Sequence, residues 1–328
     1  MKLLGKLAAG FAVLLLLVAG VGYLVLQRPD IPYEELEARY AVPTSHFLDL
    51  PDGVRAHYRD DGDPAAPTVV LVHGFGDSFL SWAPWINILS RNFRVITVDV
   101  PGHGLTRAPE SWAPTPAAQV EFIDAFATAA KLPAFAIAGN SMGGAIAWRT
   151  TLMHPERIRA LVLVDAGGFP NEKQAEQPWV FQLLATPVGR WALEHLETRP
   201  LTKASLQNTL LNNPLVTDAF VTRWVDVQLA PGHRRILMWT PGGESAGAAF
   251  KFTKADPAQL ATISVPTLVL WGEKDPLIEV AAARKFGAAI PGAAVITYPN
   301  VGHMPQLENP DQSAADVDAF LKRAMVER

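Results

Sequence analysis

A serine lies among small residues in the stretch AGNSMGGA, residues 138–145. The preceding AFAIAG has the character of a buried strand, and the following SMGGAIAWRTTLMH has that of a helix. Ser141 is therefore expected on a strand-to-helix turn, which holds a serine hydroxyl out of the sheet and leaves room only for glycine two residues to either side. Gly139 and Gly143 meet that requirement, so the pattern predicts Ser141 as a catalytic nucleophile.

A serine hydroxyl is a weak nucleophile unless a base removes its proton. His303, in YPNVGHMPQLENP, follows the last expected strand, where a loop can reach the carboxyl edge of a sheet. Asp275, in LVLWGEKDPLIEV, follows the strand before it, which gives the chain order serine, acid, histidine of one architecture of serine hydrolase. We therefore predict Ser141, Asp275 and His303 as a catalytic triad. Glu273 and Asp165 are the alternative acids.

The negative oxygen that forms in such a reaction also needs hydrogen-bond donors. In LVHGFGDS, Gly74 and Gly76 allow the backbone to curl beneath the nucleophile, and the N–H of Phe75 becomes one donor. The N–H of Met142 is the second, because it opens a helix, where backbone N–H groups are unpaired and the dipole favours negative charge. Phe75 and Met142 are thus the predicted oxyanion hole.

Other reactive groups are expected to have structural roles. His73 precedes the glycine turn and stands outside the triad order, and His103, in DVPGHGLT, is expected to brace a loop. The sequence has no cysteine, no HExxH motif and no histidines paired at ligand spacing, so we expect no catalytic metal. No GxGxxG motif follows the first buried strand, so no nucleotide site is predicted. No cofactor is expected.

Strand-like and helix-like segments alternate along most of the chain. Eight strands are expected, at HFLDL, VRAHYRD, TVVLVHG, FRVITVDV, AFAIAG, ALVLVDA, PTLVLWG and AAVITYP, and the turn PDG joins the first two as an antiparallel pair. The later runs are continuously apolar, which is typical of strands buried on both faces. With helices at residues 117–131 and 311–326, the pattern predicts an α/β fold: a mostly parallel eight-stranded sheet with helices on both faces.

One long connection interrupts this alternation. From Ala166 to Val265 no buried strand is apparent, and the stretch has helical patterns and four tryptophans. It is far longer than an ordinary loop, so we predict a helical cap inserted over the edge of the sheet. The expected organisation is a membrane anchor at 1–28, a linker at 29–44, a hydrolase core at 45–166 and 265–328, and the cap at 167–264.

The N-terminal stretch has the composition of a membrane span. Residues 7–26, LAAGFAVLLLLVAGVGYLVL, form an apolar run long enough to cross the ~30 Å hydrocarbon core of a bilayer as a helix. Lysines precede it and acidic residues follow it, which favours a cytoplasmic N-terminus. We expect an uncleaved single-pass anchor in the inner membrane, with the catalytic domain on the periplasmic side. Cleavage after VAG at residues 18–20, with secretion, is the alternative.

The overall composition excludes several other classes of function. Apolar residues make up 49% and charged residues 18% of the chain, which fills a large core and excludes a disordered protein. The net charge of -4, without a run of lysine or arginine, provides no surface for nucleic acid. No feature indicates an obligate protein partner.

The motifs HGFG, DVPGHG, GNSMGG, PTLVLWGEKDP and GHMPQLENP, in this order, resemble those of the α/β-hydrolase superfamily. The resemblance runs from about residue 45 to the C-terminus. It is greatest to the bacterial lipases and esterases often called family V, some of which carry an N-terminal membrane segment. It implies cofactor-free hydrolysis of a carboxylic ester through an acyl-enzyme on Ser141, with Asp275 as the acid and His303 as the base.

The expected substrate is an uncharged small-molecule acyl or aryl ester. The carbon–carbon bond hydrolases of aromatic ring-cleavage pathways often share GNSMGG and are the alternative. They usually have an aromatic residue after the catalytic histidine, where this chain has Met304. Haloalkane dehalogenases and epoxide hydrolases share the layout but use an aspartate nucleophile, and Ser141 argues against both.

Overall fold

The computed structural model describes residues 10, 11, 13, 14, 17, 20–170, 186–211, 213–238 and 254–326. Within these residues the chain forms one eight-stranded sheet with the strand order β1-β2-β4-β3-β5-β6-β7-β8. The strands are β1 (Ser45–Asp49), β2 (Arg55–Asp61), β3 (Thr68–Val72), β4 (Arg94–Val98), β5 (Phe135–Asn140), β6 (Ile158–Val164), β7 (Thr267–Gly272) and β8 (Ala294–Tyr298). β2 pairs antiparallel with β1 and β4, and the other pairings are parallel. The predicted α/β fold with a mostly parallel eight-stranded sheet is confirmed.

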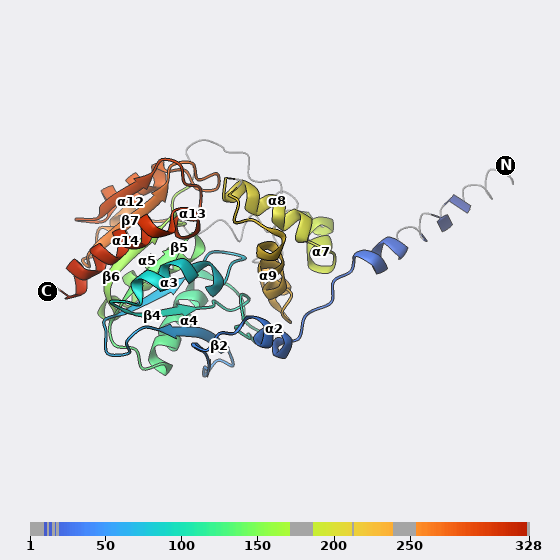
Figure 1. Cartoon of the computed structure of the whole chain (residues 1–328), viewed down its shortest axis with the longest axis horizontal. Coiled ribbons are helices and arrows are strands. Elements are labelled where there is room, and N and C mark those ends of the chain that lie inside the picture. The colour runs from blue at the N-terminus through green and yellow to red at the C-terminus, as the bar shows by residue number, and fades with distance from the viewer. Residues whose placement is uncertain are drawn as a thin grey trace.

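The central strands are apolar throughout because helices cover both faces of the sheet. Alternate residues of β3 enter opposite cores: Val70 and Val72 enter one, and Val69 and Leu71 enter the other. The first core is closed by α4 (Pro116–Ala129), α5 (Met142–Met153) and α12 (Ala281–Ala289), and the second by α3 (Ala83–Leu89) and α14 (Pro310–Leu321). Figure 1 shows α3 and α14 side by side on one face. The shorter elements are η1 (Phe79–Trp82), η2 (Pro155–Arg157), α11 (Pro257–Leu260), α13 (Pro305–Glu308) and η5 (Lys322–Val326).

The long connection between β6 and β7 is helical in its described parts. It contains α7 (Pro187–His195), α8 (Arg199–Thr209), α9 (Asp218–Gln228) and α10 (His233–Leu237). Figure 1 shows α7, α8 and α9 grouped to one side of the sheet. α8 and α9 share a small core of their own, to which Leu206 and Phe220 belong. Residues 171–185, 212 and 239–253 of the predicted cap lie outside the described residues.

The predicted linker contains a helix that packs against the cap. In α2 (Tyr33–Tyr40) two side chains are buried. Asp226 of α9 accepts hydrogen bonds from the guanidinium of Arg39 at 3.2 Å and from the hydroxyl of Tyr40 at 2.7 Å. Arg199 of α8 donates to the other oxygen of Asp226 at 2.7 Å. Residues 33–40 of the predicted linker therefore form a helix, and this helix bonds to residues of the cap that lie far away in the sequence.

The predicted membrane span lies only partly within the described residues. Residues 20–26 are helical, and no helix in the described part of the chain is long and apolar enough to cross a bilayer. The chain then meets the cap: the N–H of Glu197 donates to the carbonyl of Leu26 at 2.7 Å, and the N–H of Arg28 donates to the carbonyl of His195 at 2.9 Å. The side chains of Arg28 and Glu197 form an ion pair. The polypeptide is thus attached to the cap from Leu26 onward.

Replacement of Asp226 by alanine is expected to lower the free energy of unfolding by about 2 kcal/mol. The substitution leaves three donors without their acceptor, and the loss is smaller than for a fully buried ion pair because both arginines are partly exposed. Urea unfolding followed by tryptophan fluorescence measures it. Asp218→Ala on the same helix is the control, because Asp218 is exposed and its one ion pair among the described residues, with Lys203, lies at the surface. Equal losses for the two variants would contradict the role given to Asp226.

Candidate active site

Ser141 lies on a sharp turn between β5 and α5. Its backbone has φ 56° and ψ -114°, a conformation that non-glycine residues rarely adopt. A Cβ atom at Gly139 would lie 2.1 Å from the carbonyl oxygen of Gly143, and one at Gly143 would lie 2.0 Å from that of Val72. Both contacts are far below van der Waals distance, so only glycine fits at either position. The geometry is that of the turn expected from the sequence.

The HGFG segment packs directly against this turn. A Cβ atom at Gly74 would lie 3.4 Å from the Cβ of Ser141. The carbonyl of Gly76 accepts a hydrogen bond of 2.7 Å from the side chain of Gln228 in α9, which ties the segment to the cap. Phe75 lines the same cavity as Ser141, and Met142 is the first residue of α5. The two residues predicted as the oxyanion hole therefore lie on segments that meet at the nucleophile turn.

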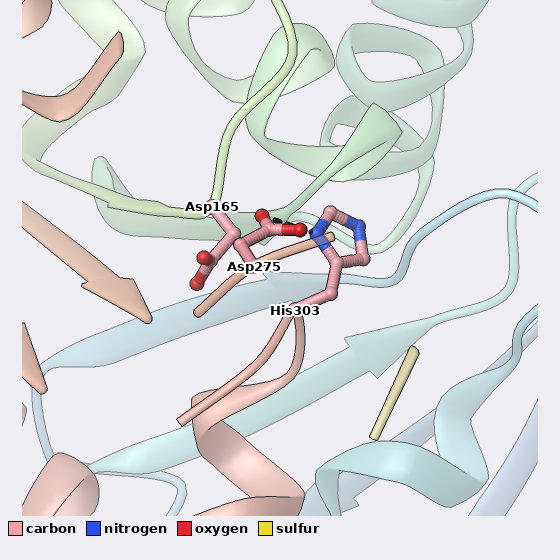
Figure 2. A group of neighbouring side chains, drawn as sticks. All are labelled: Asp165, Asp275 and His303. Carbon is pink, nitrogen blue, oxygen red and sulfur yellow. Dashed lines mark hydrogen bonds and ion pairs between the residues drawn. The ribbon is translucent and has the colours of Figure 1, made fainter. Parts of the chain in front are cut away.

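The side chains of His303 and Asp275 are hydrogen-bonded to each other. The ring Nδ1 of His303 lies 2.7 Å from Oδ2 of Asp275. Figure 2 marks this contact between the two side chains with a dashed line. The other oxygen of Asp275 accepts the backbone N–H groups of Leu277 at 2.7 Å and Ile278 at 3.1 Å. The side chain of Asn140, next to Ser141, donates to the carbonyl of His303 at 3.0 Å. The structure thus fixes the histidine loop against the nucleophile turn.

A cavity of about 220 Å³ lies between the sheet edge and the cap, and both Ser141 and His303 line it. Seven apolar side chains of the cap line it as well, namely Leu193, Leu201, Leu206, Trp224, Leu229, Leu237 and Met238. An apolar cavity beside a serine and a histidine suits a substrate with a hydrocarbon part.

The two alternative acids lie in different places. Glu273 accepts a hydrogen bond from the hydroxyl of Thr297 at 2.7 Å on the exposed surface, so it does not contact His303. Asp165 is fully buried beside Asp275, and burial together with the charge of Asp275 raises its pKa well above the usual range. The structure therefore pairs the histidine with Asp275 and places a second acid behind it.

The histidines expected to be structural are buried and neutral. His73 donates from Nδ1 to the carbonyl of Gly74 at 2.7 Å and accepts the N–H of Val100 at 3.0 Å through Nε2. Nδ1 of His103 lies 3.3 Å from the carbonyl of Pro101. Burial lowers the pKa of both histidines. These hydrogen bonds are with backbone groups of the loops at the sheet edge, which agrees with a bracing role.

Asp77 is a buried acid in the cavity wall that the sequence motifs did not single out. It directly follows the HGFG turn, and its Oδ1 accepts the N–H of Ser78 at 2.6 Å. Its Oδ2 has no hydrogen-bond partner among the described residues, and burial raises the pKa of Asp77 to about 7. The charge on this wall therefore changes near neutral pH. The sequence signal that could have identified Asp77 is its position, a few residues after a fully buried strand.

Comparison with known proteins agrees with this fold. A family model for the α/β hydrolase fold matches residues 67–310, so the chain belongs to the α/β-hydrolase fold family. The pimeloyl-(acyl-carrier protein) methyl ester esterase of Nitrosomonas europaea is 27% identical over 268 residues, which cover 77% of this chain and 95% of that protein. The predicted superfamily is confirmed.

Two further similar proteins are named for different activities. The 2-hydroxy-6-oxo-6-(2'-aminophenyl)hexa-2,4-dienoic acid hydrolase of Metapseudomonas resinovorans is 28% identical over 275 residues, covering 83% of this chain and 89% of that protein. A solved structure of a bacterial membrane phospholipase A has the same fold, with a TM-score of 0.71, 24% identity and coverage of 99% of each chain. Ester hydrolases and dienoic acid hydrolases therefore both occur among the similar proteins.

Asp77→Asn is expected to stabilise the protein more at pH 7.5 than at about pH 4.5. The carboxyl of Asp77 ionises near pH 3.8 in the unfolded chain but only near pH 7 in the folded protein. Between these values the unfolded chain loses a proton that the folded protein keeps, so the contribution of Asp77 to stability falls as pH rises. Urea unfolding of both proteins at the two pH values measures the difference. The exposed Asp52→Asn is the control for removal of an acid, and a pH-independent effect of Asp77→Asn would refute the assignment.

Proposed function

We propose that the protein is a serine hydrolase that cleaves uncharged carboxylic esters through an acyl-enzyme. The observation that carries this proposal is the 2.7 Å hydrogen bond between His303 and Asp275, beside a cavity that Ser141 also lines. Since the acid occupies Nδ1 of the histidine, Nε2 is the nitrogen left to act on the serine hydroxyl.

The proposed reaction uses the groups around this cavity in two steps. Oγ of Ser141 attacks the ester carbonyl while Nε2 of His303 takes the hydroxyl proton, and Asp275 stabilises the resulting imidazolium. The N–H groups of Phe75 and Met142 donate to the carbonyl oxygen as it becomes negative. His303 then gives its proton to the leaving alcohol. In the second step, a water molecule activated by the same histidine releases the carboxylic acid and restores the serine.

The charges around the cavity favour a neutral ester over a dienoate. A dienoic acid, of the kind named for the relative from Metapseudomonas resinovorans, carries a carboxylate that needs a cationic partner once it is buried. Among the described residues of the cavity wall, the one guanidinium is that of Arg234. It donates to Asp30 at 2.6 Å and to the carbonyl of Arg28 at 2.8 Å. Asp77 adds negative charge to the same wall above about pH 7.

Ser141→Ala is expected to reduce kcat for a p-nitrophenyl ester by about 10⁴-fold or more, because the acyl-enzyme cannot form. Ser205→Ala is the matched control: Ser205 lines the same cavity from the cap and has no proposed chemical role. Steady-state kinetics on the full-length protein measure both, with circular dichroism as a check on folding. Substantial ester hydrolysis by the folded Ser141→Ala protein would eliminate the nucleophile assignment.

The substrate class is tested in the same assay. A panel of p-nitrophenyl esters of rising chain length is compared with a ring-cleavage dienoate, and the expected result is turnover of esters. Faster turnover of the dienoate than of every ester would establish the carbon–carbon bond hydrolase in place of the esterase.

We also propose that residues 7–26 anchor the protein in the inner membrane, with the catalytic domain on the periplasmic side. The length and composition of this segment support the anchor, and so does the attachment of the chain to the cap that begins at Leu26. On α7 the ring of Trp191 stacks on that of Tyr23, with centroids 5.9 Å apart, and Val188 is 76% exposed. Contact with lipid would remove these apolar side chains from water.

Labelling of single cysteines tests this topology, because the chain has no cysteine of its own. Asp218→Cys, at an exposed site of α9, is expected to react with a membrane-impermeant maleimide once the outer membrane is permeabilised. Lys2→Cys is expected to react only after the inner membrane is also opened. The opposite pattern would overturn the orientation, and an intact mass that lacks the first 20 residues would show the secreted form instead.

A further inference from the structure

Two buried carboxyl groups lie beside His303, where the proposed reaction uses one. Asp165 directly follows β6 and Asp275 follows β7, and these strands are parallel neighbours paired at Val164 and Leu270. Their carboxyl ends therefore meet at one edge of the sheet. Figure 2 shows Asp275 between Asp165 and the ring of His303. One oxygen from each carboxyl group and one ring nitrogen of the histidine all lie within 4.8 Å of one another.

Asp275 accepts more hydrogen bonds than Asp165 does. Asp275 accepts three donors: the ring of His303 and the backbone N–H groups of Leu277 and Ile278. Asp165 accepts one, the N–H of Gly272 at 3.0 Å on Oδ1. Its Oδ2 is fully buried and has no hydrogen-bond partner among the described residues. An ionised carboxylate only accepts hydrogen bonds, whereas a protonated one also donates, so the unsatisfied Oδ2 is the atom suited to a proton.

The electrostatic interactions of the two acids also assign the proton to Asp165. Two carboxylates this close in a buried site repel each other, so one of them retains a proton. Asp275 has the donors that favour the charged form. The pKa of Asp165 is raised first by burial and then by the charge of Asp275, and Glu308 adds a smaller effect of the same sign. Tyr298 also interacts with the charge of Asp165, and its hydroxyl donates to Asp316 at 2.8 Å.

We propose that Asp165 is a positioning residue of this site, a carboxylic acid that donates its proton to Asp275 and holds that carboxylate toward His303. The same group serves as a reserve acid. When the charge at position 275 is removed, Asp165 loses its proton and provides the anion that stabilises the histidine. This inference rests on the proposed serine-hydrolase mechanism.

A double-mutant cycle separates this role from a structural one. Asp165→Asn retains an N–H donor toward Asp275 and an acceptor for Gly272, so the rate is expected to change by less than about 3-fold. Asp275→Asn is expected to lose about 10²-fold, less than the ~10⁴-fold typical when a triad loses its acid. Adding Asp165→Asn to Asp275→Asn is expected to cost about 10²-fold more, because the reserve anion is then gone. The readout is the rate at which a fluorophosphonate labels Ser141 in the full-length protein.

The outcome depends on the coupling between the two substitutions, that is, on how far the effect of Asp165→Asn differs between the wild-type and the Asp275→Asn protein. If Asp165→Asn costs the same factor in both backgrounds, the two acids act independently and the reserve role is overturned. The labelling rate is measured with and without a chelator, since a cation held by the same three groups would break the bond between His303 and Asp275. A chelator-sensitive rate would therefore also overturn the proposal.

Infrared spectroscopy tests the proton itself, even if the variants at position 275 do not fold. The wild-type protein at about pH 8 is expected to show a buried carboxylic-acid carbonyl band that is absent from Asp165→Asn. Absence of that difference shows that Asp165 is ionised and overturns the proposal. This spectrum does not depend on which bond the enzyme cleaves. Failure of the fluorophosphonate to label wild-type Ser141 would instead count against the proposed function.

Discussion

The close contact between the nucleophile turn and the sheet is the constraint on which the whole site depends. Gly143 packs against the carbonyl of Val72, and Gly139 against that of Gly143, at distances that exclude any side chain. These contacts fix the point at which α5 begins. They thereby hold Ser141 in a backbone conformation that costs about 1–3 kcal/mol. The burial of nearly every residue of α5 offsets that cost.

Much of the fold and site could be predicted because the decisive signals are local. The continuous apolar runs of the parallel strands indicate burial on both faces, and the residues that follow them gather at one edge of the sheet. Ser141, Asp275 and His303 could be predicted as a triad for that reason. The position of α2 was not, because it is set by ion pairs between Arg39, Arg199 and Asp226, which no local pattern links. The placement of Asp165 beside Asp275 likewise depends on which two strands are neighbours.

A buried polar network supports the loops beneath the candidate oxyanion hole. Asp99, directly after β4, accepts hydrogen bonds from the ring of His57 at 2.7 Å and from the N–H groups of Phe79 at 2.7 Å and Leu105 at 2.9 Å. His57 in turn bonds to the hydroxyl of Ser45 at 2.9 Å. This serine, histidine and aspartate resemble a triad by composition, but Ser45 Oγ already accepts the N–H of Val42. These three residues connect β1, β2 and the loop after β4. A serine, a histidine and an aspartate in contact therefore do not by themselves identify an active site; their surroundings decide their role.

The cap also takes part in positioning His303, the proposed base. The N–H of His303 donates to the carbonyl of Thr209, the last residue of α8, at 3.2 Å, and a Cβ atom at Gly302 would lie 2.6 Å from that same oxygen. On its other side the histidine loop is held by Asn140. A movement of α8 away from the core would therefore remove a backbone hydrogen bond from the residue that carries the imidazole. Because α8 also lines the cavity beside Ser141, the position of the cap and the position of His303 are mechanically linked.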